Sequence, residues 1–240
     1  TAAENRRIAK NAIYLYGRMI LTVGVSLYTA RVVLETLGVD NYGIYNLVGG
    51  IVAVLGFING TMAGATQRFL NYEMGGGEPS RVRRTFSNAL LIHMGIALIV
   101  LVLAETVGLW FVNTRLVIAP ERMWAANVTY QLSILAAMAS IIQIPYVASV
   151  MAHERMNIFA SMSVLNVVLV ALALVFFPGI DNLVVYAVLM LCASVLVAVL
   201  YRGYCVRHFN ECRFSMRPDR DIFTSMLKFS GWDIYGNLCY

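Results

Sequence analysis

The sequence predicts an all-α membrane protein, a polytopic bundle of six transmembrane helices. Of its 240 residues, 60% are hydrophobic and only 13% are charged, whereas soluble domains average about 45–50% apolar and about 25% charged residues. Apolar segments of about 20 residues, the length at which a helix crosses the hydrocarbon core, recur along the chain. This composition excludes a disordered chain, a disulfide-rich secreted module and an ordinary cytosolic enzyme.

The apolar segments and the turn residues between them define the six predicted spans. They cover residues 12–36, 43–66, 86–112, 124–150, 157–177 and 182–204. Glycine, asparagine and aspartate at 38–43 mark the first turn, and a Pro-Gly pair at 178–179 marks the last one. The periodicity thus predicts an even number of crossings, with both ends of this bundle on one side of the membrane.

The distribution of charge predicts which side that is. The net charge is +5, but the basic residues lie between apolar segments, so topology explains them and no nucleic-acid partner is expected. With a cytoplasmic N-terminus, 14 of the 18 lysines and arginines fall in inside segments and three in outside segments. Because cytoplasmic loops carry an excess of Lys and Arg, the N-terminus is predicted to be cytoplasmic.

Beyond the sixth span, the sequence predicts two further segments. Residues 1–206 form the six-helix transmembrane lobe, 207–228 a cytoplasmic amphipathic linker, and 229–240 the start of a seventh transmembrane helix. In the linker, Ile222 and Met226 lie at helical spacing, which favours an interfacial helix on the membrane surface; a solvated linker is the alternative. The incomplete last segment predicts that the chain is part of a longer protein.

The first span carries the most informative polar residues. Arg18, Thr22 and Ser26 fall on one face of the predicted helix. A charged side chain inside a membrane span is costly, so this face is expected to line the bundle interior or a water-filled cavity. In the alternative, Arg18 reaches back to the headgroups and the hydroxyls bond their own backbone. We take these three residues as candidate substrate-binding residues.

Further candidate substrate-binding residues lie in the second and fourth spans. Asn59 and Gln67 lie near the inner half of the second span, and Arg68 follows at the membrane edge, where it would meet an anionic headgroup or anchor the helix. Gln143 precedes Pro145, which favours a kink, and kinked helices with polar lining are typical of transporter sites. Structural hydrogen bonding between helices is the alternative role for Gln143.

Two acidic residues in the predicted spans have different predicted roles, one in ion coupling and one in an ion pair. Glu105 lies about two turns from the outer end of the third span, where a carboxylate could bind a proton or sodium. It is therefore the candidate ion-coupling residue; the alternative is an outward-facing vestibule near Trp110. Glu35 follows Arg31 by four residues, which predicts an ion pair at a helix end.

The sequence predicts no cofactor, no metal site and no enzymatic activity. The four cysteines form no CxxC pair and the three histidines are scattered without metal-ligand spacing. The glycines at 75–77 lack the Gly-Lys-Ser/Thr of a phosphate loop, and no GxSxG or HExxH occurs. The predicted loops are too short for a soluble catalytic domain.

Several segments resemble bacterial polysaccharide flippases, which belong to the superfamily of multidrug, oligosaccharidyl-lipid and polysaccharide exporters. The similar segments are Leu37-Gly38-Val39-Asp40-Asn41-Tyr42-Gly43-Ile44-Tyr45-Asn46, Gln67-Arg68-Phe69-Leu70, Gln143-Ile144-Pro145-Tyr146, Ala152-His153-Glu154-Arg155-Met156 and Lys228-Phe229-Ser230-Gly231-Trp232. The resemblance extends along the whole chain, and each motif is moderately specific.

The resemblance implies a MATE-like fold of twelve to fourteen helices in two lobes, with a central cavity of alternating access. This chain would supply the first lobe, and the missing C-terminal lobe of the same chain would complete the cavity. It also implies transport of an undecaprenyl-diphosphate-linked oligosaccharide across the bacterial inner membrane for O-antigen or lipopolysaccharide synthesis. Expected partners are the lipid-linked oligosaccharide, the lipid bilayer and, as a further candidate, polysaccharide polymerase machinery. Arg18 is the candidate ligand of the diphosphate.

Two other functions remain open from the sequence. One is a cation-coupled multidrug exporter of the same fold, with Glu105 at its ion site. The other is a membrane-embedded glycosyl- or acyltransferase, for which only His93 and His153 offer a starting point.

Overall fold

The structure, a computed structural model, describes residues 2–176, 182–213 and 219–238. Within these ranges every regular element is a helix, which confirms the all-α prediction. The helices are α1 (Ala2–Gly75), α2 (Pro79–Leu103), α3 (Leu109–Thr114), α4 (Met123–Ala152), α5 (Met156–Phe176), α6 (Asn182–His208) and α7 (Arg220–Leu238). A π-helix, Ala104–Gly108, joins α2 to α3, and short 3-10 turns lie at Pro120–Arg122 and Asn210–Cys212.

Four helical segments of the described chain are long and apolar enough to cross a membrane. They are Ile8–Val52, Pro79–Thr114, Pro120–Ala152 and Leu183–His208. A shorter apolar helical stretch covers Met156–Val170 in α5. A multi-pass membrane protein follows from these lengths and compositions, because a helix of about 20 apolar residues spans the hydrocarbon core.

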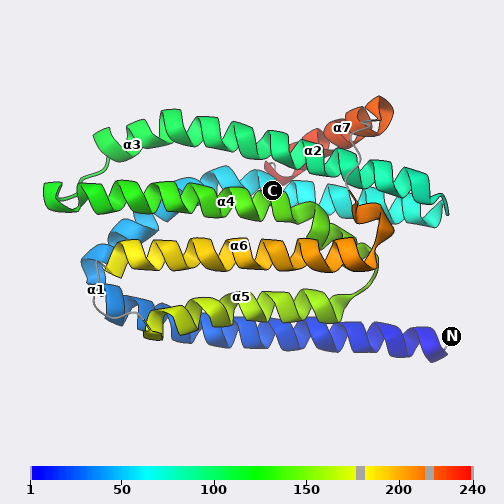
Figure 1. The fold of residues 1–240 in the computed structure, drawn as a ribbon, viewed down its shortest axis with the longest axis horizontal. Coiled ribbons are helices and arrows are strands. Elements are labelled where there is room, and N and C mark those ends of the chain that lie inside the picture. Colours follow the sequence, from blue (N-terminus) through cyan, green and yellow to red (C-terminus); the bar gives the residue numbers. More distant parts are fainter. Residues whose placement is uncertain (1, 177–181, 214–218, 239–240) are drawn as a thin grey trace.

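The chain reverses direction inside α1, at Gly38. The backbone there has φ 73° and ψ 168°, a region open essentially to glycine alone because it has no Cβ. Residues 2–37 run toward one end of the bundle and residues 39–75 return from it (Figure 1). The predicted turn at 38–43 is therefore present, and it begins at its glycine.

The helices run roughly antiparallel and bring alternate turns to the same end. The N-terminus, the turn before α2 and the α4–α5 turn lie at one end; Gly38 and the α3–α4 connection lie at the other (Figure 1). We call these the inner and the outer end, after the orientation expected from the basic residues. Helix α4 is central and packs against α1, α2 and α6, while α5 packs mainly against α1. Helix α4 continues through Pro145, which is buried.

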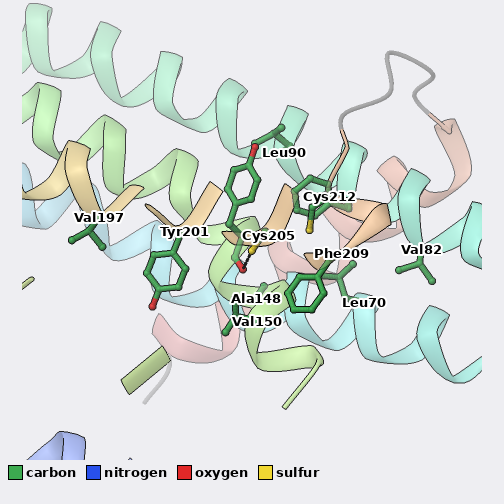
Figure 2. Close-up of a cluster of buried hydrophobic side chains, with 12 residues drawn as sticks. Leu70, Val82, Leu90, Ala148, Val150, Val197, Tyr201, Cys205, Phe209 and Cys212 are labelled. Carbon is green, nitrogen blue, oxygen red and sulfur yellow. Dashed lines mark hydrogen bonds between the residues drawn. The ribbon is translucent and has the colours of Figure 1, made fainter. Parts of the chain in front are cut away.

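A buried apolar cluster holds α2, α4 and α6 together near the inner end (Figure 2). Phe86 of α2 meets Tyr146 of α4 edge to face, with ring centroids 5.2 Å apart, a favoured aromatic geometry. Cys205 of α6 donates a weak hydrogen bond to the Tyr146 carbonyl at 3.5 Å. This cluster fixes how the three helices pack against one another near the inner end.

Helix α7 is docked on the bundle along its amphipathic face. Ile222 and Met226 are buried against Ala89 and Ile92 of α2. The same helix continues to Leu238, so the expected boundary between residues 207–228 and 229–240 falls inside one helix. The apolar face predicted for this segment thus packs against α2.

Candidate functional site: a polar track along α5

Arg18 lies in the contact between the first half of α1 and α5. Its guanidinium carbon is 4.6 Å from the centroid of the Phe159 ring of α5, a cation–π geometry. Its Nε atom is buried and has no hydrogen-bond partner within the described part of the chain. Arg18 is also within electrostatic reach of Tyr201 on α6. The guanidinium is therefore held by an aromatic ring and keeps donors available.

The hydroxyl groups that follow Arg18 along α1 are not bonded to their own backbone. Thr22 and Thr29 bury their Oγ1 atoms without a hydrogen-bond partner among the described residues. Ser26 and Thr29 line a cavity of about 280 Å³ between α1, α5 and α6. The polar face of α1 therefore points partly into open space between helices, as expected if it lines a cavity, and its threonines depart from the alternative of backbone bonding.

Asn166 of α5 lies where this cavity meets a second one. It lines the 280 Å³ cavity together with Asn46, and it also lines a cavity of about 190 Å³ with Gln143 of α4 and Ser194 of α6. Ser163, one turn closer to the inner end, donates to the Phe159 carbonyl of its own helix at 2.8 Å and lies within interaction distance of Tyr201 of α6. These groups form a polar track along α5.

We define the polar track by the residues that flank this face of α5. They are Arg18, Ser26, Thr29, Asn46, Gln143, Ser163, Asn166, Ser194 and Tyr201. Apart from Arg18 they are uncharged. Asn46, Ser163 and Ser194 donate to carbonyls four residues earlier in their own helices, so their oxygens face the track as acceptors. Such a track suits a neutral polyhydroxylated ligand with an anionic group at one end.

The structure brings only some of the predicted binding residues to this track. Gln67 is half-buried and Arg68 is exposed near α7, where its guanidinium carbon lies 5.1 Å from the centroid of the Phe229 ring. Asn59 lies in α1, but its side chain is outside the described residues. Arg68 therefore anchors α7 in this structure, on the second half of α1 and away from Arg18.

Sequence reasoning missed the contribution of α5. Ser163 and Asn166 are three residues apart, a spacing that places them on one helical face. That signal was available in the sequence, but the facing residues Ser194 and Asn46 come from distant positions that only packing brings together.

Glu105 lies apart from the polar track, in the π-helix that joins α2 to α3 and contacts α4. Its Oε2 accepts a hydrogen bond of 3.0 Å from Nε2 of Gln131. The neighbouring Tyr130 hydroxyl donates to the Ala104 carbonyl at 2.8 Å, and it occupies the space that a Cβ at Gly108 would need. Glu105 therefore pairs with an amide, and it lies in a π-helical segment whose backbone accepts a hydrogen bond from Tyr130.

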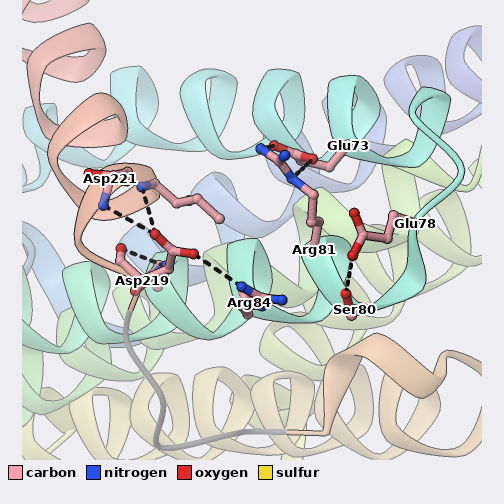
Figure 3. A network of polar contacts seen from close by, with 9 residues as sticks. Glu73, Glu78, Ser80, Arg81, Arg84, Asp219 and Asp221 are labelled. Carbon is pink, nitrogen blue, oxygen red and sulfur yellow. Dashed lines mark hydrogen bonds and ion pairs between the residues drawn. The ribbon is translucent and has the colours of Figure 1, made fainter.

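The inner end is tied together by ion pairs between its turns (Figure 3). Arg81 pairs with Glu73 at 3.0 Å, and Arg84 pairs with Asp219 at 3.4 Å. His153 Nε2 lies 3.0 Å from Glu211 Oε1. This hydrogen bond raises the pKa of His153 and lowers the pKa of Glu211, against the opposing effect of burial on both groups. These contacts connect α1 to α2, α2 to α7, and the α4–α5 turn to the segment after α6.

The ion pair expected at the end of the first span is also present. Arg31 Nε lies 2.8 Å from Glu35 Oε1 on the exposed surface, which confirms that prediction. The described residues contain no group of three or more His, Cys, Asp and Glu side chains that could hold a metal ion. Cys192, Cys205 and Cys212 are free thiols.

Comparison of the chain with protein-family models, with curated proteins and with solved structures finds no match.

Proposed function

We propose that this protein is a bacterial inner-membrane transporter that flips an undecaprenyl-diphosphate-linked oligosaccharide by alternating access, for surface polysaccharide synthesis. The observation that carries the proposal is the polar track along α5, which begins at Arg18 and continues through neutral amides and hydroxyls at Asn166. The segments similar to polysaccharide flippases support the same function.

The proposal includes six membrane spans with a cytoplasmic N-terminus. The two halves of α1 on either side of Gly38 each count as one span, and α5 completes the six. The inner end carries the arginines of the turns, including Arg81, Arg155 and Arg213, as the positive-inside rule requires of a cytoplasmic face.

The chemistry of the track matches the parts of such a substrate. Arg18 would hold the diphosphate, because guanidinium groups form charge-assisted hydrogen bonds with phosphate oxygens. Asn166, Gln143 and Ser194 would exchange hydrogen bonds with sugar hydroxyls. The apolar outer surface of the bundle, with exposed side chains such as Ile20 on α1, would leave the prenyl chain in lipid. In this proposal the C-terminal lobe closes the other side of the cavity.

The test is complementation of surface polysaccharide export in cells that lack the transporter. Arg18→Ala is expected to abolish export while the protein level, measured by immunoblot, is retained. Arg31→Ala is the matched control, since Arg31 is exposed and pairs only locally with Glu35, and it should export normally. Asn166→Leu should reduce export by removing the amide at the meeting point of the two cavities. Normal export by Arg18→Ala would contradict the assignment of Arg18 to the diphosphate.

A cation-coupled multidrug exporter of the same fold is the second candidate, and the contact of Glu105 with Gln131 favours it. Such an exporter would confer drug resistance that Glu105→Gln abolishes. A polysaccharide flippase would confer no resistance with either residue at this position, so a growth assay with toxic cations separates the two functions.

A further inference from the structure

We propose that the π-helix Ala104–Gly108 and the facing residues of α4 form a proton-binding site centred on Glu105. The proposal rests on four contacts that the π-helix and α3 make with α4 and on the chemistry of the amide that faces the carboxylate. It deepens the transport proposal by naming the ion, and it rests on that proposal only for its link to transport.

The backbone at this site departs from an α-helix in a way that one side chain stabilises. In a π-helix the backbone hydrogen bonds join residues five positions apart instead of four, and such segments occur frequently at functional sites. Here the Tyr130 hydroxyl, which is fully buried, donates to the carbonyl of Ala104 at 2.8 Å. Gly108 leaves room for that hydroxyl, because a Cβ at this position would overlap it. The π-helix and Tyr130 therefore form one unit, which places Glu105 against Gln131.

Gln131 can pair with Glu105 in both of its protonation states. In the structure the Gln131 amide nitrogen donates to Glu105 Oε2 at 3.0 Å, as a carboxylate requires. When the carboxylate takes a proton from a hydronium ion, one O–H bond of hydronium breaks, one O–H bond forms at the carboxyl group, water is released, and the acid becomes a donor. A half-turn of the Gln131 amide then presents its carbonyl oxygen as the acceptor, since the side chain carries both groups.

The composition of the site favours a proton over a metal cation. A sodium or divalent ion needs several oxygen ligands, whereas the side-chain partner of Glu105 in the described structure is the single amide of Gln131, which presents its nitrogen. The Ala104 carbonyl is already bonded to Tyr130. A proton needs only the carboxylate and one partner, and a membrane interior makes the neutral acid less costly than the anion.

A second polar contact lies between Glu105 and the outer end of the bundle. Asn113 of α3 and Asn127 of α4 exchange amide hydrogen bonds of 3.0 and 3.1 Å. Asn127 precedes Gln131 by four residues, so the two amides lie on one face of α4. The two contacts place polar side chains between Glu105 and the outer end of the bundle.

Among the described residues near Glu105, the charged and titratable side chains are engaged with other partners, so the carboxylate of Glu105 is the group that accepts the proton. From α4 the titratable neighbour is Tyr130, whose hydroxyl is engaged with the backbone. From α1 the neighbour at Gly108 is the apolar Ile51. Arg115, further along the same helical segment, packs over the ring of Trp110.

The test is an infrared pH titration of the full chain in lipid vesicles without substrate, which monitors the carbonyl band of a protonated carboxylic acid. Every carboxylate of the chain contributes to the bands that appear on acidification, so the signal of Glu105 is the component that is missing in Glu105→Gln. The same component should be retained in the control Glu121→Gln, whose side chain is exposed. In Gln131→Leu, which keeps the carboxylate but removes its donor, the component should persist at a shifted frequency, because its hydrogen-bond partner is gone.

Three results would overturn the proposal. They are identical acidification bands in the wild-type protein and Glu105→Gln, loss of the component in Glu121→Gln, and a midpoint of the component that moves when potassium is replaced by sodium, which would indicate a metal cation. Gln131→Leu keeps the test informative if Glu105→Gln does not fold. Because no substrate is present, the titration can succeed even if the polysaccharide proposal fails.

Discussion

Gly108→Ala is expected to destabilise the protein, although alanine is a better helix former than glycine. A Cβ at residue 108 would overlap the Tyr130 hydroxyl oxygen, and it would lie 3.2 Å from the ring carbon that bears it. Tyr130 is buried, so it can move only by breaking its bond to the Ala104 carbonyl. The Ala104 carbonyl would keep the backbone N–H of Leu109 as a donor, but a buried Tyr130 hydroxyl without its acceptor costs about 1–3 kcal/mol. An extra methyl group in a packed site costs about 1–3 kcal/mol, and helix propensity returns about 1 kcal/mol. The expected net loss of unfolding free energy is about 3 kcal/mol.

The double variant Gly108→Ala/Tyr130→Phe isolates the cause. Phenylalanine lacks the hydroxyl that meets the new methyl group, and the hydrogen bond from residue 130 to the Ala104 carbonyl is already absent in that background. The contact of 3.2 Å between the new Cβ and the ring carbon remains, so adding Gly108→Ala to Tyr130→Phe should change the unfolding free energy by no more than about 1 kcal/mol. Gly95→Ala is the matched control in α2, because nothing lies within 4 Å of its built Cβ, and it should be neutral or stabilising.

The assay is reversible unfolding in mixed micelles, followed by circular dichroism, for the four combinations at residues 108 and 130. The expected interaction energy between the two sites is about 2 kcal/mol or more, well above the error of additivity for independent sites. An equal cost of Gly108→Ala in both backgrounds would refute the idea that the Tyr130 hydroxyl occupies the space left by the glycine.

Three further predictions follow from local contacts. Gly38→Ala should lower the free energy of unfolding by about 1–3 kcal/mol, because the backbone conformation of Gly38 is nearly closed to other residues. An unfolding midpoint equal to that of the wild-type protein would contradict this. Met226→Ala, at a fully buried position, should cost about 2–5 kcal/mol, while Leu227→Ala, at an exposed one, should cost far less; equal losses would argue against the docking of α7. The pair of His153 and Glu211 should contribute about 1 kcal/mol. Its contribution should be full between the ordinary pKa values of 4.5 and 6.5, fade as pH rises through the raised pKa of His153, and fade again as pH falls through the lowered pKa of Glu211. Unfolding of His153→Gln against wild type across pH checks this, and a difference that grows above pH 6.5 would contradict the sign.

The helices themselves were largely predictable from the sequence. The predicted segments 124–150, 157–177 and 182–204 correspond to α4, α5 and α6, which begin within one residue of those positions. In a membrane, every backbone polar group must be bonded within the segment, so an apolar stretch of sufficient length becomes a helix. The turn at Gly38 and the Arg31–Glu35 pair were also predictable, because both depend on residues within four positions of each other.

The candidate site was predictable only in part. The sequence placed Arg18 and Ser26 on one face of a helix, and that face does lie against α5. The sequence did not indicate Asn166, because the proposed role of this residue depends on the two cavities that α1, α4 and α6 form around it. The prediction for residues 207–228 gave the amphipathic face of α7 but not its docking on α2, since periodicity does not say which surface covers an apolar face.

The sequence by itself determined that this is a multi-pass helical membrane protein, where α4, α5 and α6 begin, and which few polar residues interrupt the apolar segments. Composition and spacing carry that information because the membrane penalises any other backbone arrangement. The tertiary structure decided which polar residues meet. The polar track along α5 and the π-helix held by Tyr130 both join side chains more than twenty residues apart, and contacts at that distance follow from helix packing, which no local pattern specifies.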